Sequence, residues 1–202
     1  MRLDNEPAAV LMGHPSLFEK QKEISADKIH SDDFQHNLMV LKNSQYRLDG
    51  IGLAAPQIGW MARVFCLGID NNNRNRYAGA PDIPFQFWIN PKIRAVSPTT
   101  SWGWEGCISV PGIRGWIERP SHVDVEGLNE KGEVVQMRMT GFAAKVFQHE
   151  LDHLNGTLFT MRVSDIHLVV PMESMKYQSQ WAKKWPTPSA NKTPPGVLSP
   201  SR

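Results

Sequence analysis

The five residues His149-Glu150-Leu151-Asp152-His153 constrain this chain more than any other segment. Residues four apart lie on one face of an α-helix, so both histidines reach one metal ion only if this segment is helical. The glutamate after the first histidine is then placed to deprotonate a water molecule on that metal. The segment predicts a helix, a metal site and a hydrolytic reaction together. The simpler alternative is a solvated helix face that carries polar residues.

Length and composition suit one domain with tails. The chain has 202 residues, of which 41% are hydrophobic and 21% charged, as is ordinary for a globular protein. No apolar run approaches the length of a membrane span, and the acidic residues near the N-terminus do not fit a signal peptide. We therefore expect a cytoplasmic protein without a membrane partner, although a mature organellar form stays open.

The charge distribution bears on partners. A net charge of +2 gives no argument for specific nucleic-acid binding. The stretch from Ser174 onward has no acidic residue and carries the cations Lys176, Lys183, Lys184, Lys192 and Arg202. Such a stretch could touch a polyanion such as ribosomal RNA in a transient association, but a solvated basic tail is the simpler interpretation.

The pattern of short apolar segments predicts an α+β fold, with mainly antiparallel strands around a central helix that carries the two histidines. A first helix should begin at Ser31, because Phe34, Leu38 and Leu41 follow with helical spacing. Strands are expected at residues 62–70, 85–90, 93–97, 102–110, 113–118, 122–128 and 133–140, with a hairpin turn at 129–132. The central helix should cover residues 141–154 and end at Asn155-Gly156.

The remaining segments are expected to be irregular. Residues 71–84 contain an asparagine run and prolines, which predicts an exposed loop. We expect a catalytic domain at residues 1–165 and a C-terminal extension at 166–202, Pro-rich and extended or disordered from about residue 186. The two cysteines make no disulfide framework: Cys66 lies in an apolar strand and should be buried, whereas Cys107 lies among polar and glycine residues.

Two histidines do not complete a metal site, because catalytic sites of this kind usually have three protein ligands. Cys107, in the segment Glu105-Gly106-Cys107-Ile108-Ser109, could supply a thiolate. Glu173 could instead supply a carboxylate, as in a thermolysin-like metallopeptidase. The spacing of the residues does not decide between the two.

A Gly-rich segment, Gly50-Ile51-Gly52-Leu53-Ala54-Ala55-Pro56-Gln57, is a third candidate part of the site. Its small residues allow a backbone to approach a ligand closely, and Gln57 offers an amide donor. It lacks the spacing of a phosphate-binding loop, so nucleotide binding is not expected.

In this order, the segments 50–57, 105–109 and 149–153 resemble the three signature motifs of the peptide deformylases, and the resemblance runs from about residue 10 to about residue 162. It implies hydrolysis of the formyl group of N-formylmethionine on newly made polypeptides by a bacterial-type cytoplasmic enzyme. The ligands of one divalent metal ion would be Cys107, His149 and His153. That ion would be ferrous iron, with zinc, nickel or cobalt as substitutes, and Glu150 would be the general acid and base.

The resemblance also implies roles around the metal. The Gln57 side chain and the Ile108 backbone N–H would stabilise the oxyanion, and Glu105 and Asp152 would orient ligands and loops. The substrate would be held by residues that match the family's peptide-binding positions: Ile51, Gly52, Arg114, Phe142 and Val146.

Two points stay open at this stage. Lys145 stands on the pocket side of the helix where relatives commonly have an apolar residue, so either the pocket rim is more polar or Lys145 points outward. The alternatives to a deformylase are a metallopeptidase that uses Glu173, and a non-catalytic homologue that binds peptide N-termini. An intact set of site residues argues against the last alternative: Cys107, His149, Glu150, His153 and Gln57.

Overall fold

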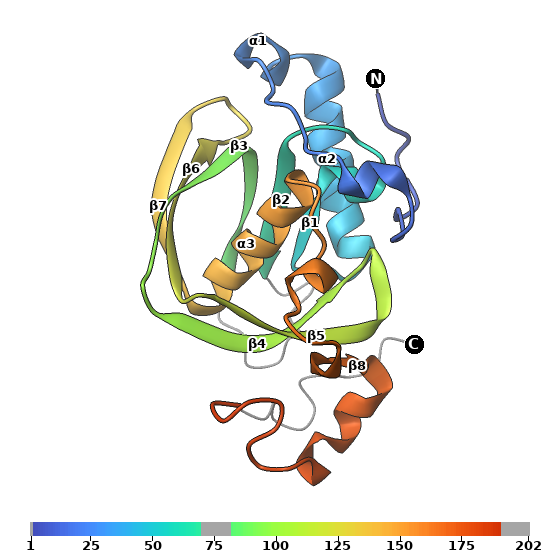
Figure 1. The fold of residues 1–202 in the computed structure, drawn as a ribbon. Coiled ribbons are helices and arrows are strands. Elements are labelled where there is room, and N and C mark those ends of the chain that lie inside the picture. The colour runs from blue at the N-terminus through green and yellow to red at the C-terminus, as the bar shows by residue number, and fades with distance from the viewer. Residues whose placement is uncertain (1, 70–81, 191–202) are drawn as a thin grey trace.

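The computed structural model describes residues 2–69 and 82–190, and it confirms the α+β class (Figure 1). Five antiparallel strands form the larger sheet, in the order β1 (Gly52–Ala54), β2 (Val64–Ile69), β3 (Ile83–Val96), β6 (His122–Leu128) and β7 (Val134–Thr140). Three strands form the smaller sheet, in the order β4 (Thr100–Cys107), β5 (Val110–Pro120) and β8 (Val169–Pro171). The α-helices are α1 (Ala26–Ile29), α2 (Asp32–Arg47) and α3 (Gly141–Leu154).

The larger sheet is covered on both faces by helices. Every residue of β2 is buried, as expected of a strand with packing on both sides. Its side chains alternate: Phe65 and Leu67 pack in the core that contains α3, whereas Val64 and Cys66 pack in the core that contains α2. Cys66 is therefore the buried structural thiol that the sequence predicts, and burial raises its pKa well above the usual value.

Both long helices begin or end where the sequence indicates. The Ser31 hydroxyl caps α2 by accepting a hydrogen bond from the Phe34 N–H at 3.4 Å. Helix α3 ends at Asn155, and Gly156 then adopts the left-handed conformation, with φ of +72°. Because a Cβ at Gly156 would lie 2.5 Å from the Phe18 carbonyl oxygen, only glycine fits this position.

Residues 85–97 differ from the prediction, because the two expected short strands are one long strand, β3. Asn90 has a φ of +52° and Pro91 follows it, so the register shifts there without ending the strand. The Asn90 side chain stabilises the bulge by exchanging two hydrogen bonds of 2.8 Å with the backbone of Ile24. The expected loop at 71–84 is also too long, since Ile83 already belongs to β3; residues 70–81 lie outside the described residues.

The expected strand at 102–110 is instead two strands joined by a tight turn. β4 ends at Cys107, β5 begins at Val110, and these two residues pair across the turn formed by Ile108 and Ser109. The sequence does not reveal this turn because it contains neither glycine nor proline. The hairpin of β6 and β7 is confirmed, with Gly132 at a φ of +77° in its turn.

The C-terminal part packs on the smaller sheet. β8 pairs with β5, and a 3-10 helix, η6 (Met172–Gln180), follows it. Trp116 is buried and stacks with Trp102, while Trp104 contacts Trp116, Trp181 and Trp185 at centroid distances of 5.1 to 6.0 Å. The tryptophans of this sheet are therefore packing residues.

Thr187, near the start of the C-terminal tail, also contacts the smaller sheet: the Trp116 indole N–H donates to its hydroxyl at 3.2 Å. The division at residue 165 stays a prediction, and residues 191–202 lie outside the described residues. In the part of the chain that the structure describes, no helix is both long and apolar enough to cross a membrane.

Candidate active site

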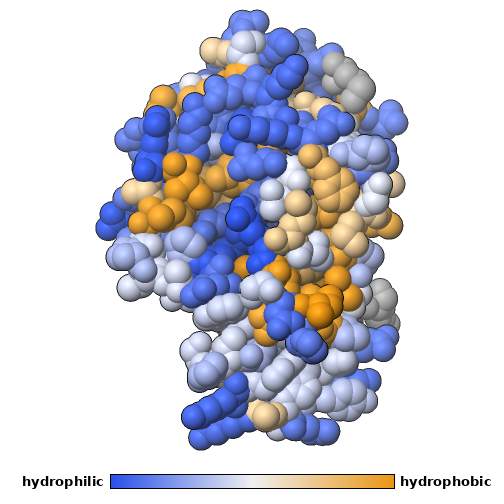
Figure 2. All heavy atoms as spheres, viewed as in Figure 1, coloured by the Kyte–Doolittle hydropathy of each residue, from blue (hydrophilic) through white to orange (hydrophobic). Residues whose placement is uncertain are grey.

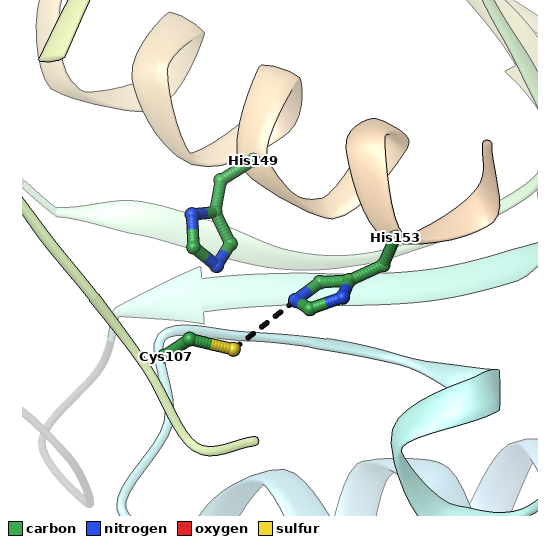
Figure 3. A group of neighbouring side chains, drawn as sticks. All are labelled: Cys107, His149 and His153. Atoms are coloured by element: carbon green, nitrogen blue, oxygen red, sulfur yellow. Dashed lines mark hydrogen bonds between the residues drawn. The ribbon is translucent and has the colours of Figure 1, made fainter. Parts of the chain in front are cut away.

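Helix α3 and the end of β4 bring the three predicted ligands together (Figure 3). The Cys107 Sγ lies 3.3 Å from the His153 Nε2, and one ligand atom each from Cys107, His149 and His153 all lie within 4.8 Å of one another. Among residues 2–69 and 82–190, this is the one group of at least three His, Cys, Asp or Glu side chains placed to hold a metal ion. In the view of Figure 2, hydrophilic residues gather in the middle of the face, over the region where α3 runs in Figure 1, between hydrophobic areas.

Glu105 orients the first histidine. Its carboxylate lies 2.9 Å from the His149 Nδ1, which leaves the Nε2 for a metal ion. Arg119 binds the same carboxylate with two hydrogen bonds, of 2.5 and 2.9 Å, and donates a third of 2.9 Å to Asp152. Arg162 also donates two hydrogen bonds to Asp152, of 2.5 and 3.1 Å. Both predicted orienting carboxylates thus belong to one buried network.

The network holds Glu105 in its charged form. Burial by itself would raise the pKa of this carboxyl, but the hydrogen bonds from Arg119 and His149 outweigh burial and lower the pKa to about 2. The carboxylates in turn raise the pKa of Arg119, although burial opposes this. Glu105 is therefore a fixed anion behind His149 and not a group that exchanges protons near neutral pH.

Cys107 is prepared to act as a thiolate. Burial would raise the pKa of its thiol, but the two nearby imidazoles, His153 foremost, lower it well below the usual value. The Ser109 N–H also donates to the sulfur, at 3.3 Å. The deprotonated thiol is the form that binds a metal ion.

The residues present fit a divalent metal ion. One thiolate and two imidazoles are ligands typical of zinc or ferrous iron, and three protein ligands leave a further coordination position open. On a tetrahedral zinc ion, ordinary bond lengths place a sulfur and a nitrogen ligand about 3.6 Å apart. The observed 3.3 Å between Cys107 and His153 is close to that separation.

Glu150 lies beside the ligands in a different environment. It is 4% exposed, and its Oε2 has no hydrogen-bond partner among the described residues. Burial raises the pKa of this carboxyl to about 7, against the opposing charges of His149 and His153. A carboxyl with a pKa near neutrality can both accept and return a proton.

Gly52 makes room for this carboxyl. A Cβ at position 52 would lie 2.3 Å from the Glu150 Oε1, so any side chain larger than hydrogen would displace the carboxylate. The group that lies close to the backbone of β1 is therefore Glu150, whereas the predicted approach of this backbone to a ligand stays a prediction.

The Gln57 amide is held in one orientation. Its Oε1 accepts from the Ala54 N–H at 2.8 Å, so its NH₂ group points to the Ser109 hydroxyl at 3.2 Å and the Cys107 sulfur at 3.4 Å. Ile108 follows Cys107 directly, in the turn between β4 and β5. The two candidate donors therefore come from the two loops next to the thiolate, Gln57 from the Gly-rich segment and Ile108 from the turn between β4 and β5.

An N-terminal segment connects these two loops. The Val10 N–H donates to the Gln57 carbonyl and the Met12 N–H donates to the Ser109 carbonyl, each at 2.7 Å. The sequence gives no sign that residues so far apart along the chain are joined in this way.

Three of the predicted substrate-binding residues pack in the core that contains α3. Val146 is buried, and the half-buried Ile51 and Phe142 pack against the same core. Arg114 lies on β5 against Gly106, where a Cβ would be 2.1 Å from the guanidinium Nη1. By contrast, Glu173 is exposed in the first turn of η6 and is not part of the ligand group, so the alternative third ligand is wrong.

Arg119 is the main residue that sequence reasoning missed. It is 5% exposed and lies in phase with the buried Gly115 and Ile117 of β5, whereas Glu118 is exposed. An arginine at a buried position of an alternating strand implies a buried acid as its partner. Its place two residues after Ile117 could have suggested that Arg119 is buried, but not which acids it meets.

Known proteins resemble this chain over most of its length. The family model described as Polypeptide deformylase matches residues 8–168. A peptide deformylase of Leptospira biflexa is 36% identical over 157 residues, which are 78% of this chain and 87% of that protein. The peptide deformylase 1 of Bordetella pertussis is 42% identical over 159 residues, 79% of this chain and 88% of that protein.

A solved structure agrees with these matches. The class I type b peptide deformylase from Acinetobacter baumannii, bound to Met-Ala-Ser, has a TM-score of 0.74 and 33% identity. The match covers 81% of this chain and all of that one (100%).

Proposed function

The chain belongs to the peptide deformylase family, which removes the formyl group from the N-terminus of nascent polypeptides, and we propose that Cys107, His149 and His153 hold the metal ion of this reaction. The observation that carries the proposal is the convergence of one sulfur and two imidazoles within 4.8 Å, beside the buried Glu150. A divalent ion, for which we propose ferrous iron with zinc, nickel or cobalt as substitutes, would lower the pKa of a water molecule and polarise the formyl carbonyl.

Glu150 is the general base and then the general acid. Its carboxylate takes a proton from the attacking water as the water oxygen bonds to the formyl carbon. It then gives that proton to the leaving nitrogen as the C–N bond breaks, so that formate and a free amine result. The pKa of about 7 supports this role, because the same group must be charged in one step and neutral in the next.

The Gln57 amide and the Ile108 backbone N–H stabilise the negative charge that develops on the formyl oxygen. The fixed orientation of the Gln57 amide supports this role, because its donors need no rearrangement during the reaction. Its contact with Ser109 also ties the amide to the loop that carries Ile108.

The peptide lies along β1. Backbone groups of Ile51 and Gly52 pair with the substrate main chain as an added strand, and Arg114 lies near the same main chain. Phe142 and Val146 line the pocket for the first side chain. The enzyme is cytoplasmic, of the bacterial type, and contacts the ribosome only transiently while it acts on N-formylmethionyl nascent chains.

The test is formate release from formyl-Met-Ala-Ser, whose product is the peptide bound in the Acinetobacter baumannii structure, by protein purified and iron-loaded without oxygen. We expect turnover that Cys107→Ala abolishes together with metal binding, whereas the matched variant Glu173→Ala keeps both. Metal retained by Cys107→Ala would contradict the proposed ligand set. A protein that binds metal and peptide but releases no formate would be the non-catalytic homologue.

A further inference from the structure

Lys145 is a cation next to the proposed active site that the reaction above does not use. It lies on α3, one helical turn before His149 and next to Val146, and its side chain is half-buried. Residues four apart share a helix face, so Lys145 points to the same side of α3 as the first histidine.

The position of the ammonium follows from Gly103 on β4. A Cβ at Gly103 would lie 1.8 Å from the Lys145 Nζ and 3.2 Å from its Cε. The end of the lysine side chain therefore occupies the space that a side chain at position 103 would fill. Residues 103 and 105 lie on the same face of their strand, and Glu105 contacts His149 from that face. The ammonium is thus between β4 and α3, on the side that faces the histidine, and does not point outward.

The Lys145 ammonium has N–H donors that bind no group among the described residues. Among residues 2–69 and 82–190, no hydrogen bond and no ion pair within 4 Å involves Lys145. Glu105, the acid whose charge acts on Lys145, already bonds to Arg119 and His149. Burial lowers the pKa of Lys145, and the charge of Glu105 opposes this. A partly desolvated ammonium with three donors is a strong site for a hydrogen-bond acceptor.

The proposed function places the substrate's first side chain close to this group. That side chain branches from the Cα two bonds from the formyl carbon, which reacts at the ligand group of Cys107, His149 and His153. In the proposed function this side chain lies against the surface of α3 that carries Phe142 and Val146, on the half of the helix that precedes His149. Lys145 borders this surface from the β4 side.

We propose that Lys145 determines specificity, by donating a hydrogen bond to the end of the substrate's first side chain. The enzyme would then act on formylated peptides whose first side chain ends in a hydrogen-bond acceptor, such as methionine sulfoxide, as well as on those that begin with methionine. This inference rests on the proposed function, since it concerns the substrate of the same site.

The test compares two substrates that differ at the end of the first side chain: formyl-(methionine sulfoxide)-Ala-Ser, which has an acceptor, and formyl-norleucine-Ala-Ser, which has none. The readout is the ratio of kcat/KM for the sulfoxide peptide to that for the norleucine peptide. We expect Lys145→Met to lower this ratio about tenfold, as for loss of one hydrogen bond to a charged donor. Lys145→Arg keeps a charged donor and should keep most of the ratio.

Lys131→Met is the matched control, because it removes the same charge from the exposed turn between β6 and β7. It should leave the ratio unchanged. An unchanged ratio in Lys145→Met, with formate still released from norleucine peptide, would overturn the inference while the proposed function stands. Absence of formate from either peptide with the unmodified protein would instead overturn the proposed function.

Discussion

Two buried glutamates next to the ligand group differ in almost every contact. Glu105 receives hydrogen bonds from Arg119 on both of its oxygens and faces His149. Glu150 has an oxygen without a partner among the described residues and lies against the backbone of Gly52. The pKa is about 2 for Glu105 and about 7 for Glu150.

The comparison shows that hydrogen-bond partners, and not burial, divide the roles of these two groups. Both side chains are almost fully buried, at 6% and 4% exposed. The partnered carboxylate is a permanent charge that orients a ligand, and the unpartnered one can exchange protons. Substitutions on each side should therefore have different consequences.

The largest effect is expected on the Glu150 side. Glu150→Gln keeps the shape of the side chain but removes the proton acceptor, so kcat/KM should fall by about 10²- to 10⁴-fold while the metal content stays the same. Formate release and elemental analysis of the same preparation measure the two quantities. An equal loss of metal would show that Glu150 stabilises the ligand group instead of acting in the reaction.

The next largest effect is expected when a side chain at position 52 displaces Glu150. In Gly52→Ala, the new Cβ would be 2.3 Å from the carboxylate, which must move. A displacement of about 1 Å in a catalytic group costs on the order of 10² in rate, with metal content unchanged. Rate and metal content are again the measurements. Full activity would mean that the carboxylate position is not critical.

A smaller effect is expected on the Glu105 side. Glu105→Gln leaves His149 without a charged partner, so metal affinity should fall by about 10- to 100-fold, and activity should return when excess metal is supplied. Glu118→Gln on β5 is the matched control, since Glu118 is exposed. Activity that stays low at saturating metal would assign Glu105 a role beyond orienting the ligand.

The last effect is in the stability of the metal-free protein, where the two glutamates act with opposite sign. The pKa of Glu105 is lowered from 4.5, so its contribution is present above about pH 4.5 and is lost as the pH falls toward 2. The pKa of Glu150 is raised from 4.5, so its contribution is present below about pH 4.5 and is lost as the pH rises through 7.

Urea unfolding at a series of pH values tests this pair of signs. Relative to the unmodified protein, Glu105→Gln should flatten the loss of unfolding free energy below pH 4.5, and Glu150→Gln should flatten the loss between pH 4.5 and 7. If one variant reduced the loss of unfolding free energy both below pH 4.5 and between pH 4.5 and 7, the two groups would titrate as one unit.

The grouping of His149, Glu150 and His153 could be predicted from the sequence because helical spacing alone brings these three residues together. Cys107 needed the resemblance, since its spacing from the helix left Glu173 open as a ligand. Arg119 escaped prediction because its partners Glu105 and Asp152 are 14 and 33 residues away and meet only in the folded sheet. The spacing of apolar and polar residues predicts whether a segment is a helix or a strand, but not which segments lie next to one another in the fold.

The same limit explains the errors in the fold. The strand at 85–97 appeared interrupted because Pro91 removes a backbone donor, yet pairing with β6 resumes after the bulge. The hairpin of β6 and β7 was predictable because its alternation and its glycine turn are both local signals.

The hydrogen bonds of the Val10 and Met12 amides affect how the protein unfolds locally around the site. Because these two amides bind the carbonyls of Gln57 and Ser109, one short segment is bonded to both of the loops next to the thiolate. Local unfolding of that segment would release the two loops in a single event. The amide protons of Val10 and Met12 should therefore exchange with solvent at a common rate. That rate measures how often the loops that carry Gln57 and Ser109 are released together.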